Sequence, residues 1–157
     1  MPKPILKDNN LVSLIKDNIK LINELDNKII IDFKTSNLEI LLNSDSEQLS
    51  RVFFNLIKNS IESIQDKKID NIDLIGKIDI SINENVEKID FIIIDNGLGF
   101  GVFADNIKDI LNPYFTTKKN GTGLGLSIVN KIINDHNGKI NFVSLDNAAK
   151  IEIIFTK

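Results

Sequence analysis

The sequence predicts an α+β fold: a two-layer α/β sandwich in which helices cover one face of a mixed, mostly antiparallel sheet. Segments with apolar residues at helical spacing alternate with short β-branched segments. Their order is helix, two strands, long helix, two strands, glycine-rich stretch, helix and two strands. Most neighbouring strands are joined by turns too short for a crossover, so their pairing should be largely antiparallel.

Composition limits the classes of function. The 157 residues suffice for one domain with its own core, and the net charge of −3, with no block of Lys or Arg, gives no footprint for nucleic acid. The absence of cysteine excludes disulfides and a thiol nucleophile, and the single histidine excludes a multi-histidine metal site. No apolar run approaches the roughly 18 residues that span a bilayer, so we expect no membrane contact by this domain.

The N-terminal half should contain a short helix, two strands and a long helix. Residues 1–10 carry two prolines and polar side chains, which predicts an extended lead-in. From Leu11, helical spacing continues for about three turns, and strands are expected at residues 29–33 and 38–42. Ser44-Asp45-Ser46-Glu47 has capping-box spacing and should begin the long helix, which ends near residues 66–68.

The C-terminal half should complete the sheet. Strict alternation over residues 78–82 predicts a strand with one buried face, and residues 89–94 form the most apolar strand, expected at the centre. A helix over residues 124–136 should stop at Asn137-Gly138. A hairpin formed by residues 140–143 and 151–155 ends the chain.

The long helix carries a polar stripe between its apolar positions: Arg51, Asn55, Asn59, Glu62 and Asp66. The carboxamides of Asn55 and Asn59, one turn apart, can offer oxygens to a cation and NH₂ groups to phosphate oxygens. A solvated helix face explains the stripe equally simply. Asparagine is a poor helix former, however, so two in one turn favour a purpose.

Two glycine-rich segments flank a candidate lid. Asp95-Asn96-Gly97-Leu98-Gly99 follows the most apolar strand, where a carboxylate can accept a hydrogen bond from an exocyclic amine such as that of adenine; an ordinary β-turn is the alternative. Gly121-Thr122-Gly123-Leu124-Gly125 feeds a helix N-terminus, a natural phosphate site, although a plain helix cap also fits. Its spacing matches neither Walker A nor the dinucleotide motif.

Between these segments, residues 101–120 are expected to form a lid that is poorly ordered without a nucleotide. Six of the eight glycines lie between Gly97 and Gly125, which indicates a loop shaped around a ligand. Lys118 could reach a terminal phosphate, and Phe115 could anchor the lid to the core. A surface lysine and an ordinary core anchor are the alternatives.

Together and in this order, the motifs resemble the catalytic and ATP-binding domain of bacterial two-component sensor histidine kinases, which has a Bergerat-type fold. Residues 55–60 resemble the N box, 95–99 the first glycine box, 113–118 the F box and 121–127 the second glycine box. The resemblance covers residues 11–157. Several details also look like the nitrogen-regulation type of sensor kinase.

This resemblance implies roles for individual residues. Asn59 would hold a Mg²⁺ ion at the ATP phosphates with help from Asn55, and Asp95 would bind the adenine amine. Lys118 would neutralise the γ-phosphate, which makes Asn55 and Lys118 the candidate catalytic residues. The other residues implied to bind the nucleotide are Gly97, Gly99, Phe115, Thr116, Gly121, Thr122, Gly123, Leu124 and Gly125.

At Glu62 and Asn55, this chain differs from other members of the family or from related hydrolases. Many members of the family have a lysine where this chain has Glu62, and whether Lys58 or Arg51 supplies that cation stays open. Related hydrolases carry a water-activating glutamate at the position of Asn55, which cannot act as a base. The chain therefore resembles the phosphotransferases, in which catalysis is mainly positioning and charge neutralisation.

The resemblance also implies partners. The phosphoacceptor histidine should lie on a separate dimerisation domain, and a response regulator should receive the phosphoryl group. His136, the single histidine, is expected to be structural, so the chain would be an excised fragment or a truncated protein. We expect a cytoplasmic domain, and a membrane anchor in the parent protein stays open.

Two other functions remain to be tested. A serine kinase of the anti-sigma type would act on a partner protein, but such kinases usually keep a carboxylate at the position of Asn55. A degenerate kinase would dock a partner without binding ATP, which the intact motifs disfavour.

Overall fold

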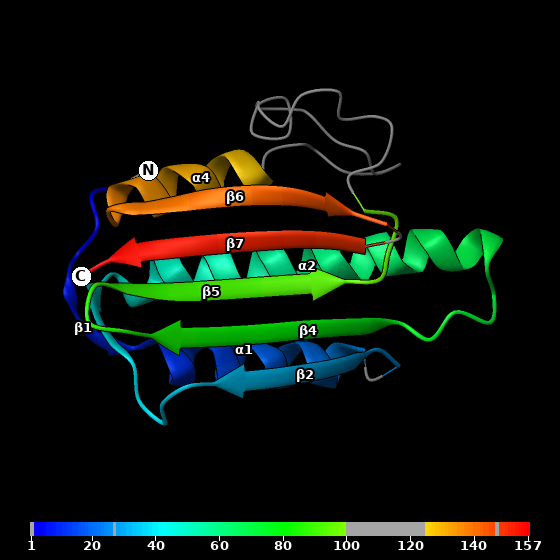
Figure 1. The fold of residues 1–157 in the computed structure, drawn as a ribbon, viewed down its shortest axis with the longest axis horizontal. Coiled ribbons are helices and arrows are strands. Elements are labelled where there is room, and N and C mark those ends of the chain that lie inside the picture. The colour runs from blue at the N-terminus through cyan, green and yellow to red at the C-terminus, as the bar shows by residue number, and fades with distance from the viewer. Residues whose placement is uncertain (1, 27, 100–124, 147) are drawn as a thin grey trace.

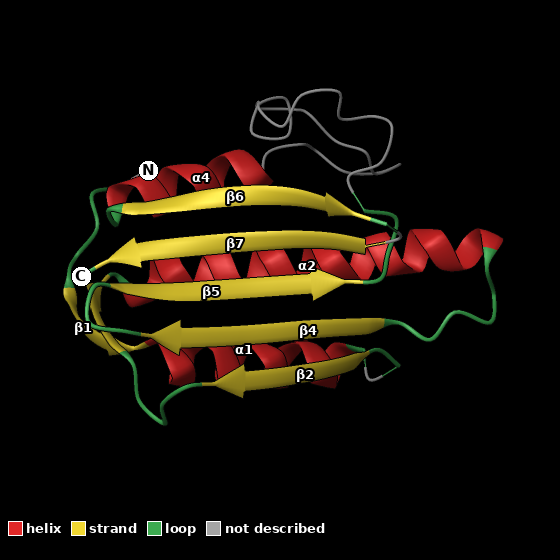
Figure 2. Ribbon diagram, viewed as in Figure 1, coloured by secondary structure: helices red, strands yellow, loops and turns green. Residues whose placement is uncertain are grey.

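The structure, a computed structural model, describes residues 2–26, 28–99, 125–146 and 148–157. Its main sheet has five strands in the order β2-β4-β5-β7-β6. Helices of the described chain cover one face of this sheet and leave the other open (Figures 1 and 2). The bounds of these elements are α1 Leu11–Leu25, β2 Ile30–Thr35, α2 Ser46–Asp70, β4 Lys77–Glu84, β5 Lys88–Asp95, α4 Gly125–Asp135, β6 Gly138–Leu145 and β7 Ala148–Thr156. The predicted two-layer sandwich is confirmed.

The pairing of the main sheet is mixed, as predicted. Strand β2 runs parallel to β4, and the β4–β5, β5–β7 and β6–β7 pairs are antiparallel. The apolar strand β5 lies at the centre. A parallel pair needs a crossover connection, and here the chain between β2 and β4 includes all of α2.

A second, two-stranded sheet consists of β1 (Lys7–Asn10) and β3 (Leu41–Ser44). Part of the predicted lead-in is therefore a paired strand. The strand predicted at residues 38–42 begins at Leu41 and pairs outside the main sheet. Asn10 holds the start of α1 next to the segment before β3. Its side-chain oxygen accepts the backbone N–H of Val12, which caps α1, and also the backbone N–H of Ile40.

The core lies between the sheet and the helices. Alternate residues of β4 and β5 point toward the helices and are buried, as the strict alternation predicts. At its centre, the rings of Phe53 on α2 and Phe91 on β5 lie 5.0 Å apart at an angle of 44°. Burial of each such aromatic side chain contributes about 2 kcal/mol, so this contact helps to fix α2 on the middle strand.

The start of α2 differs from the prediction. Asp45 is the N-cap, and its Oδ1 accepts the backbone N–H of Gln48 at 3.0 Å. Ser44 cannot take that place because it is the last residue of β3, fully buried, and its hydroxyl donates to the Leu42 carbonyl. The other oxygen of Asp45 accepts the N–H of Ile5 at 2.9 Å, which fastens the N-terminal segment to α2.

His136 joins the end of α4 to the beginning of α2. It is buried, its Nε2 accepts the backbone N–H of Asp45 at 3.0 Å, and its Nδ1 lies 2.7 Å from the Ile132 carbonyl. These partners require a neutral ring with the proton on Nδ1. Both ring nitrogens are engaged, which supports the structural role expected for His136. Asn137 then adopts a left-handed conformation, φ 57°, at the predicted helix stop.

The cap of α2 predicts a pH-dependent stability. Hydrogen bonds from the backbone N–H groups of Ile5, the larger effect, and Gln48 lower the pKa of Asp45 below its ordinary value. A lowered pKa stabilises the fold above the unfolded-state value, about pH 4, and that stabilisation is lost as the pH falls through the folded-state value. Asp45→Asn removes the charge and the acceptor for Ile5, so it should cost about 1 kcal/mol near pH 7.

Urea unfolding near pH 7 and near pH 3 measures this effect. The difference between wild type and Asp45→Asn should shrink at the lower pH, whereas Asp8→Asn, at an exposed carboxylate of β1, should have little effect at either pH. An Asp45→Asn penalty that is the same at both pH values would contradict the account.

Candidate functional site

The polar stripe on α2 provides one wall of the candidate site. Asn55 and Asn59 are partly exposed, and the structure extends their four-residue spacing to Ser63 and Lys67, which bind the loop that follows β5. Each step of four residues advances about 6 Å along a helix. Measured along α2 from Ser63, where this loop is attached, Asn59 therefore lies about 6 Å away and Asn55 about 12 Å away.

The loop after β5 presents Asp95 in a fixed orientation. Asp95 is the last residue of β5, is 6% exposed, and accepts the backbone N–H of Gly97 on its Oδ1 at 2.9 Å. Asn96 fixes the other side of the loop: its side chain accepts the N–H of Lys77 at 2.9 Å and donates to the Ile75 carbonyl at 2.9 Å. The Asp95 carboxylate is thus positioned by the backbone of its own loop.

Gly97 brings this loop into direct contact with α2. A Cβ at Gly97 would lie 2.4 Å from Ser63 Oγ, 2.7 Å from the Ser63 carbonyl carbon and 2.8 Å from the Ile64 nitrogen. The backbone N–H of Leu98 donates to Ser63 Oγ at 2.9 Å, and Lys67 Nζ donates to the Asn96 carbonyl at 3.2 Å. Such a close approach is available only to glycine.

The structure therefore packs the loop after Asp95, through Gly97, on the helix that carries Asn55 and Asn59. Gly99 ends the described part of the loop with φ 72°, a conformation that glycine adopts without strain. In Figure 1, β5 ends and α4 begins toward the same side of the molecule.

Lys58 and Arg51 are the candidates for the cation that many family members have at the position of Glu62. Lys58 Nζ lies 3.8 Å from Glu62 Oε1, one turn along α2. The two side chains are 57% and 35% exposed, so the pair contributes little stability. Lys58 is therefore directed toward the carboxylate, and Arg51 is exposed on the same helix.

Comparison with known proteins identifies the family. The family model described as "Histidine kinase-, DNA gyrase B-, and HSP90-like ATPase" matches residues 44–156, most of the chain. The chain belongs to this family. The resemblance noted in the sequence motifs is thereby confirmed.

Within the family, the chain is similar to sensor kinases. The putative sensor histidine kinase NtrY-like of Rickettsia prowazekii (strain Madrid E) is 30% identical over 156 residues, 99% of this chain and 25% of the relative. The sensory histidine kinase/phosphatase NtrB of Rhizobium leguminosarum bv. phaseoli is 37% identical over 119 residues, 71% of this chain and 30% of the relative. The chain thus spans less than a third of the length of either relative.

Solved structures agree. The catalytic domain of histidine kinase ThkA, in a nucleotide-free form, superposes with a TM-score of 0.83 at 29% identity, over 98% of this chain and 96% of that one. ThkA in complex with response regulator protein TrrA gives a TM-score of 0.76 at 28% identity, over 97% of this chain and 42% of that chain. The α+β fold is that of a histidine kinase catalytic domain.

Part of the predicted site lies outside the described residues. This holds for the lid at 101–120 and for Phe115, Thr116, Lys118, Gly121, Thr122, Gly123 and Leu124, whose roles stay predictions. Gly125 is the first residue of α4, which packs against α2. The described part of the second glycine box, residues 125–127, is helical.

Sequence motifs did not reveal Ser63 and Lys67. The predicted stripe followed Glu62 and Asp66, whereas the residues that bind the loop continue the exact four-residue spacing from Asn55 and Asn59. This four-residue spacing could have pointed to Ser63 and Lys67 from the sequence. Choosing between the two stripes, however, requires knowing that the loop after β5 crosses α2 at Ser63, which is a tertiary contact.

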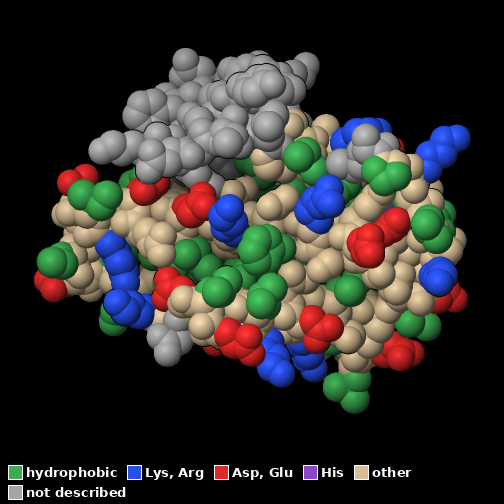
Figure 3. All heavy atoms as spheres, turned by 180° about the vertical axis from the view of Figure 1, so that it is seen from behind, with side chains coloured by type: hydrophobic (Ala, Val, Ile, Leu, Met, Phe, Trp, Pro, Cys, Tyr) green, Lys and Arg blue, Asp and Glu red, His purple; other side chains and the backbone are tan. Residues whose placement is uncertain are grey.

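The described surface carries charged side chains of both signs. On the helix-bearing face in Figure 3, acidic and basic side chains are interspersed over the described part. Among the described residues, no group of three or more His, Asp or Glu side chains could hold a metal ion. No helix of the described chain is long and apolar enough to cross a membrane.

The contact at Gly97 predicts a selective effect of one methyl group. Gly97→Ala should displace the loop from α2, because two of the three atoms that the new Cβ meets are backbone atoms. Calorimetry should show ATP binding weakened at least about tenfold, with a loss of stability of about 1–3 kcal/mol.

Gly125→Ala is the matched control for stability, since no described atom lies within 4 Å of its added Cβ. Thermal unfolding should show Gly97→Ala clearly less stable than Gly125→Ala. Equal stability of the two variants, together with unchanged ATP binding by Gly97→Ala, would rule out the tight loop contact.

Proposed function

We propose that this chain is the ATP-binding catalytic domain of a sensor histidine kinase. It donates the γ-phosphoryl group of ATP to a histidine on a separate dimerisation domain, for relay to an aspartate of a response regulator. The observation that carries this proposal is the attachment of the Asp95 loop to the helix that bears Asn55 and Asn59. Recognition of a base and of its phosphates then occurs on one rigid unit.

In this proposal, Asp95 recognises adenine. Its buried carboxylate is oriented by the Gly97 N–H and can accept a hydrogen bond from the adenine amine. Gly97 shapes the pocket by letting the loop pack on α2, and Gly99 leaves room for the base beside the backbone. A carboxylate accepts but does not donate hydrogen bonds, so it favours adenine over guanine, which presents a carbonyl at the corresponding ring position.

Asn59 is the proposed Mg²⁺ ligand, with Asn55 beside it. Mg²⁺ prefers oxygen ligands and in nucleotide sites is usually held by one or two protein groups together with phosphates and water. A partly exposed carboxamide on α2, in a region without a cluster of carboxylates among the described residues, fits that pattern. When bound, Mg²⁺ would neutralise charge on the phosphates.

The remaining roles concern phosphoryl transfer. Thr122, Gly123, Leu124 and Gly125 would offer backbone N–H groups to the phosphates, and Lys118 would neutralise the γ-phosphate. Phe115, Thr116 and Gly121 would shape the lid. Asn55 is not a base, which fits transfer to an incoming histidine, since the enzyme then mainly positions and neutralises the reacting groups.

The partners follow from the same proposal. ThkA has been solved with a response regulator, TrrA, and we propose a response regulator as the final acceptor here as well. The dimerisation domain would precede this chain, and the residues before β1 would belong to the connection. The domain would be cytoplasmic and make no contact with nucleic acid or membrane, whether or not its parent protein is membrane-anchored.

Binding and transfer assays test the proposal. Calorimetry should show Mg²⁺-dependent ATP binding that Asp95→Asn and Asn59→Ala each weaken about tenfold or more, the size of one lost hydrogen bond or ligand at a desolvated site. Asn141→Ala, an exposed asparagine of β6, is the matched control and should bind normally. Undiminished binding by both site variants would refute the assignment.

The chemistry of the product separates the alternatives. The domain, incubated with radiolabelled ATP and the dimerisation domain of a related kinase, should form an acid-labile, base-stable phosphohistidine. An acid-stable product would favour the serine kinase. No nucleotide binding at about 1 mM ATP would favour the non-catalytic docking module.

A further inference from the structure

The outer edge of β2 is open. Among the described strands, β2 is an edge of the main sheet and pairs with β4 alone. The N–H groups of Ile30 and Ser36 donate to carbonyls of the β4 side at 3.0 Å, so by alternation the backbone N–H and C=O groups of Ile31 and Phe33 point to the outer edge. No described strand pairs with them there. An edge of this kind is a template for a further strand.

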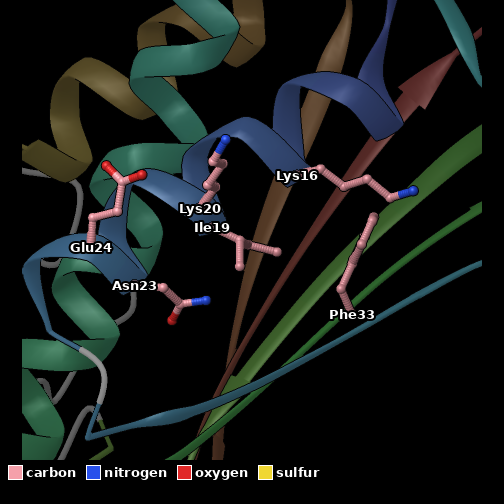
Figure 4. A pocket seen from close by; sticks show the side chains of 6 residues that line it. All are labelled: Lys16, Ile19, Lys20, Asn23, Glu24 and Phe33. Atoms are coloured by element: carbon pink, nitrogen blue, oxygen red, sulfur yellow. The ribbon is translucent and has the colours of Figure 1, made fainter.

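A groove runs along this edge on the helix side. It has a volume of about 400 Å³ and lies between α1 and β2. Its apolar surface is formed by Ile19 and Phe33, both partly buried against the core. Figure 4 shows the Phe33 ring rising from β2 toward α1, with Ile19 directed to the same space. Side chains of an added strand would alternate between this groove and the open face.

The rim of the groove is mainly basic. Lys16 and Lys20, one turn apart on α1, are exposed, and neither forms an ion pair with a described residue. Asn23 and Glu24 line the end of the groove beyond Lys20. The two lysines are about 6 Å apart along α1. Their long side chains point apart in Figure 4, which suits carboxylates four residues apart on a strand, about 13 Å from one another.

We propose that the β2 edge and the α1 groove form a docking site for an extended acidic segment of a partner protein. The segment adds to β2 as a strand. Its apolar side chain packs on Ile19 and Phe33, and carboxylates two residues away on either side meet Lys16 and Lys20. The partner motif is therefore acidic-x-apolar-x-acidic. The site is separate from the proposed nucleotide site, because it lies on α1 and the edge strand β2, whereas the nucleotide site lies on α2 and the loop after β5.

The opposite edge of the sheet does not offer the same features. Strand β6 contacts α4, and in Figure 1 α4 lies beside its outer edge. The corresponding lysines near that edge, Lys139 and Lys150, lie on the sheet and not on a facing helix. They therefore provide a control for non-specific attraction of acidic peptides.

The test uses synthetic seven-residue peptides of the form Thr-Asp-Thr-X-Thr-Asp-Thr, with X as Val, Ile, Leu, Phe or Tyr, titrated into ¹⁵N-labelled protein to about 1 mM. Signals of the Ile31 and Phe33 amides should shift, and their hydrogen exchange should slow when peptide is bound. Peptides with Lys in place of Asp should bind at least about tenfold more weakly.

Variants complete the test. The double variant Lys16→Glu, Lys20→Glu should weaken binding about tenfold or more, whereas Lys139→Glu, Lys150→Glu should not. Absence of binding by every peptide, perturbation of β6 in place of β2, or equal binding of the Asp and Lys peptides would overturn the proposal. ATP binding is measured in parallel and should be unchanged in both double variants, which separates this site from the proposed function.

Discussion

The candidate site depends on the contact between Gly97 and the backbone of α2 at Ser63 and Ile64. This contact brings the end of the central strand against the long helix at a distance that no residue with a Cβ could reach. Hydrogen bonds from Leu98 to Ser63 and from Lys67 to Asn96 hold the same junction. Because of it, a carboxylate on the sheet and the carboxamides on the helix have a fixed separation.

The other end of α2 is fixed independently. Asp45 caps the helix and binds the N-terminal segment, and His136 accepts the Asp45 N–H while its ring is held by the last turn of α4. Asn55 and Asn59 lie between these two attachments. A helix held at both ends positions its side chains more precisely than a loop does. If the proposed nucleotide site is correct, part of the ordering cost of binding is therefore met by folding.

Local patterns predicted most of the fold, because alternation and helical spacing report burial directly. Strand β5 was expected at the centre and the hairpin at the C-terminus, and both are there. The cap at Asp45, the pairing of Lys7–Asn10 with β3, and the role of Ser63 were not predicted. Each depends on which residues are neighbours in space, and spacing along the chain does not carry that information. The family's motifs singled out Asp95 and Asn59 as candidates, and the packing at Gly97 shows how the loop after Asp95 is held on the helix that carries Asn59.

The most direct test is a crystal structure of the domain with Mg²⁺ and a non-hydrolysable ATP analogue. The account predicts the adenine amine within hydrogen-bond distance of the Asp95 carboxylate and Mg²⁺ on the carboxamide oxygen of Asn59, with Gly97 still packed on Ser63. A nucleotide bound elsewhere, or one bound here with the Asp95 loop detached from α2, would contradict it.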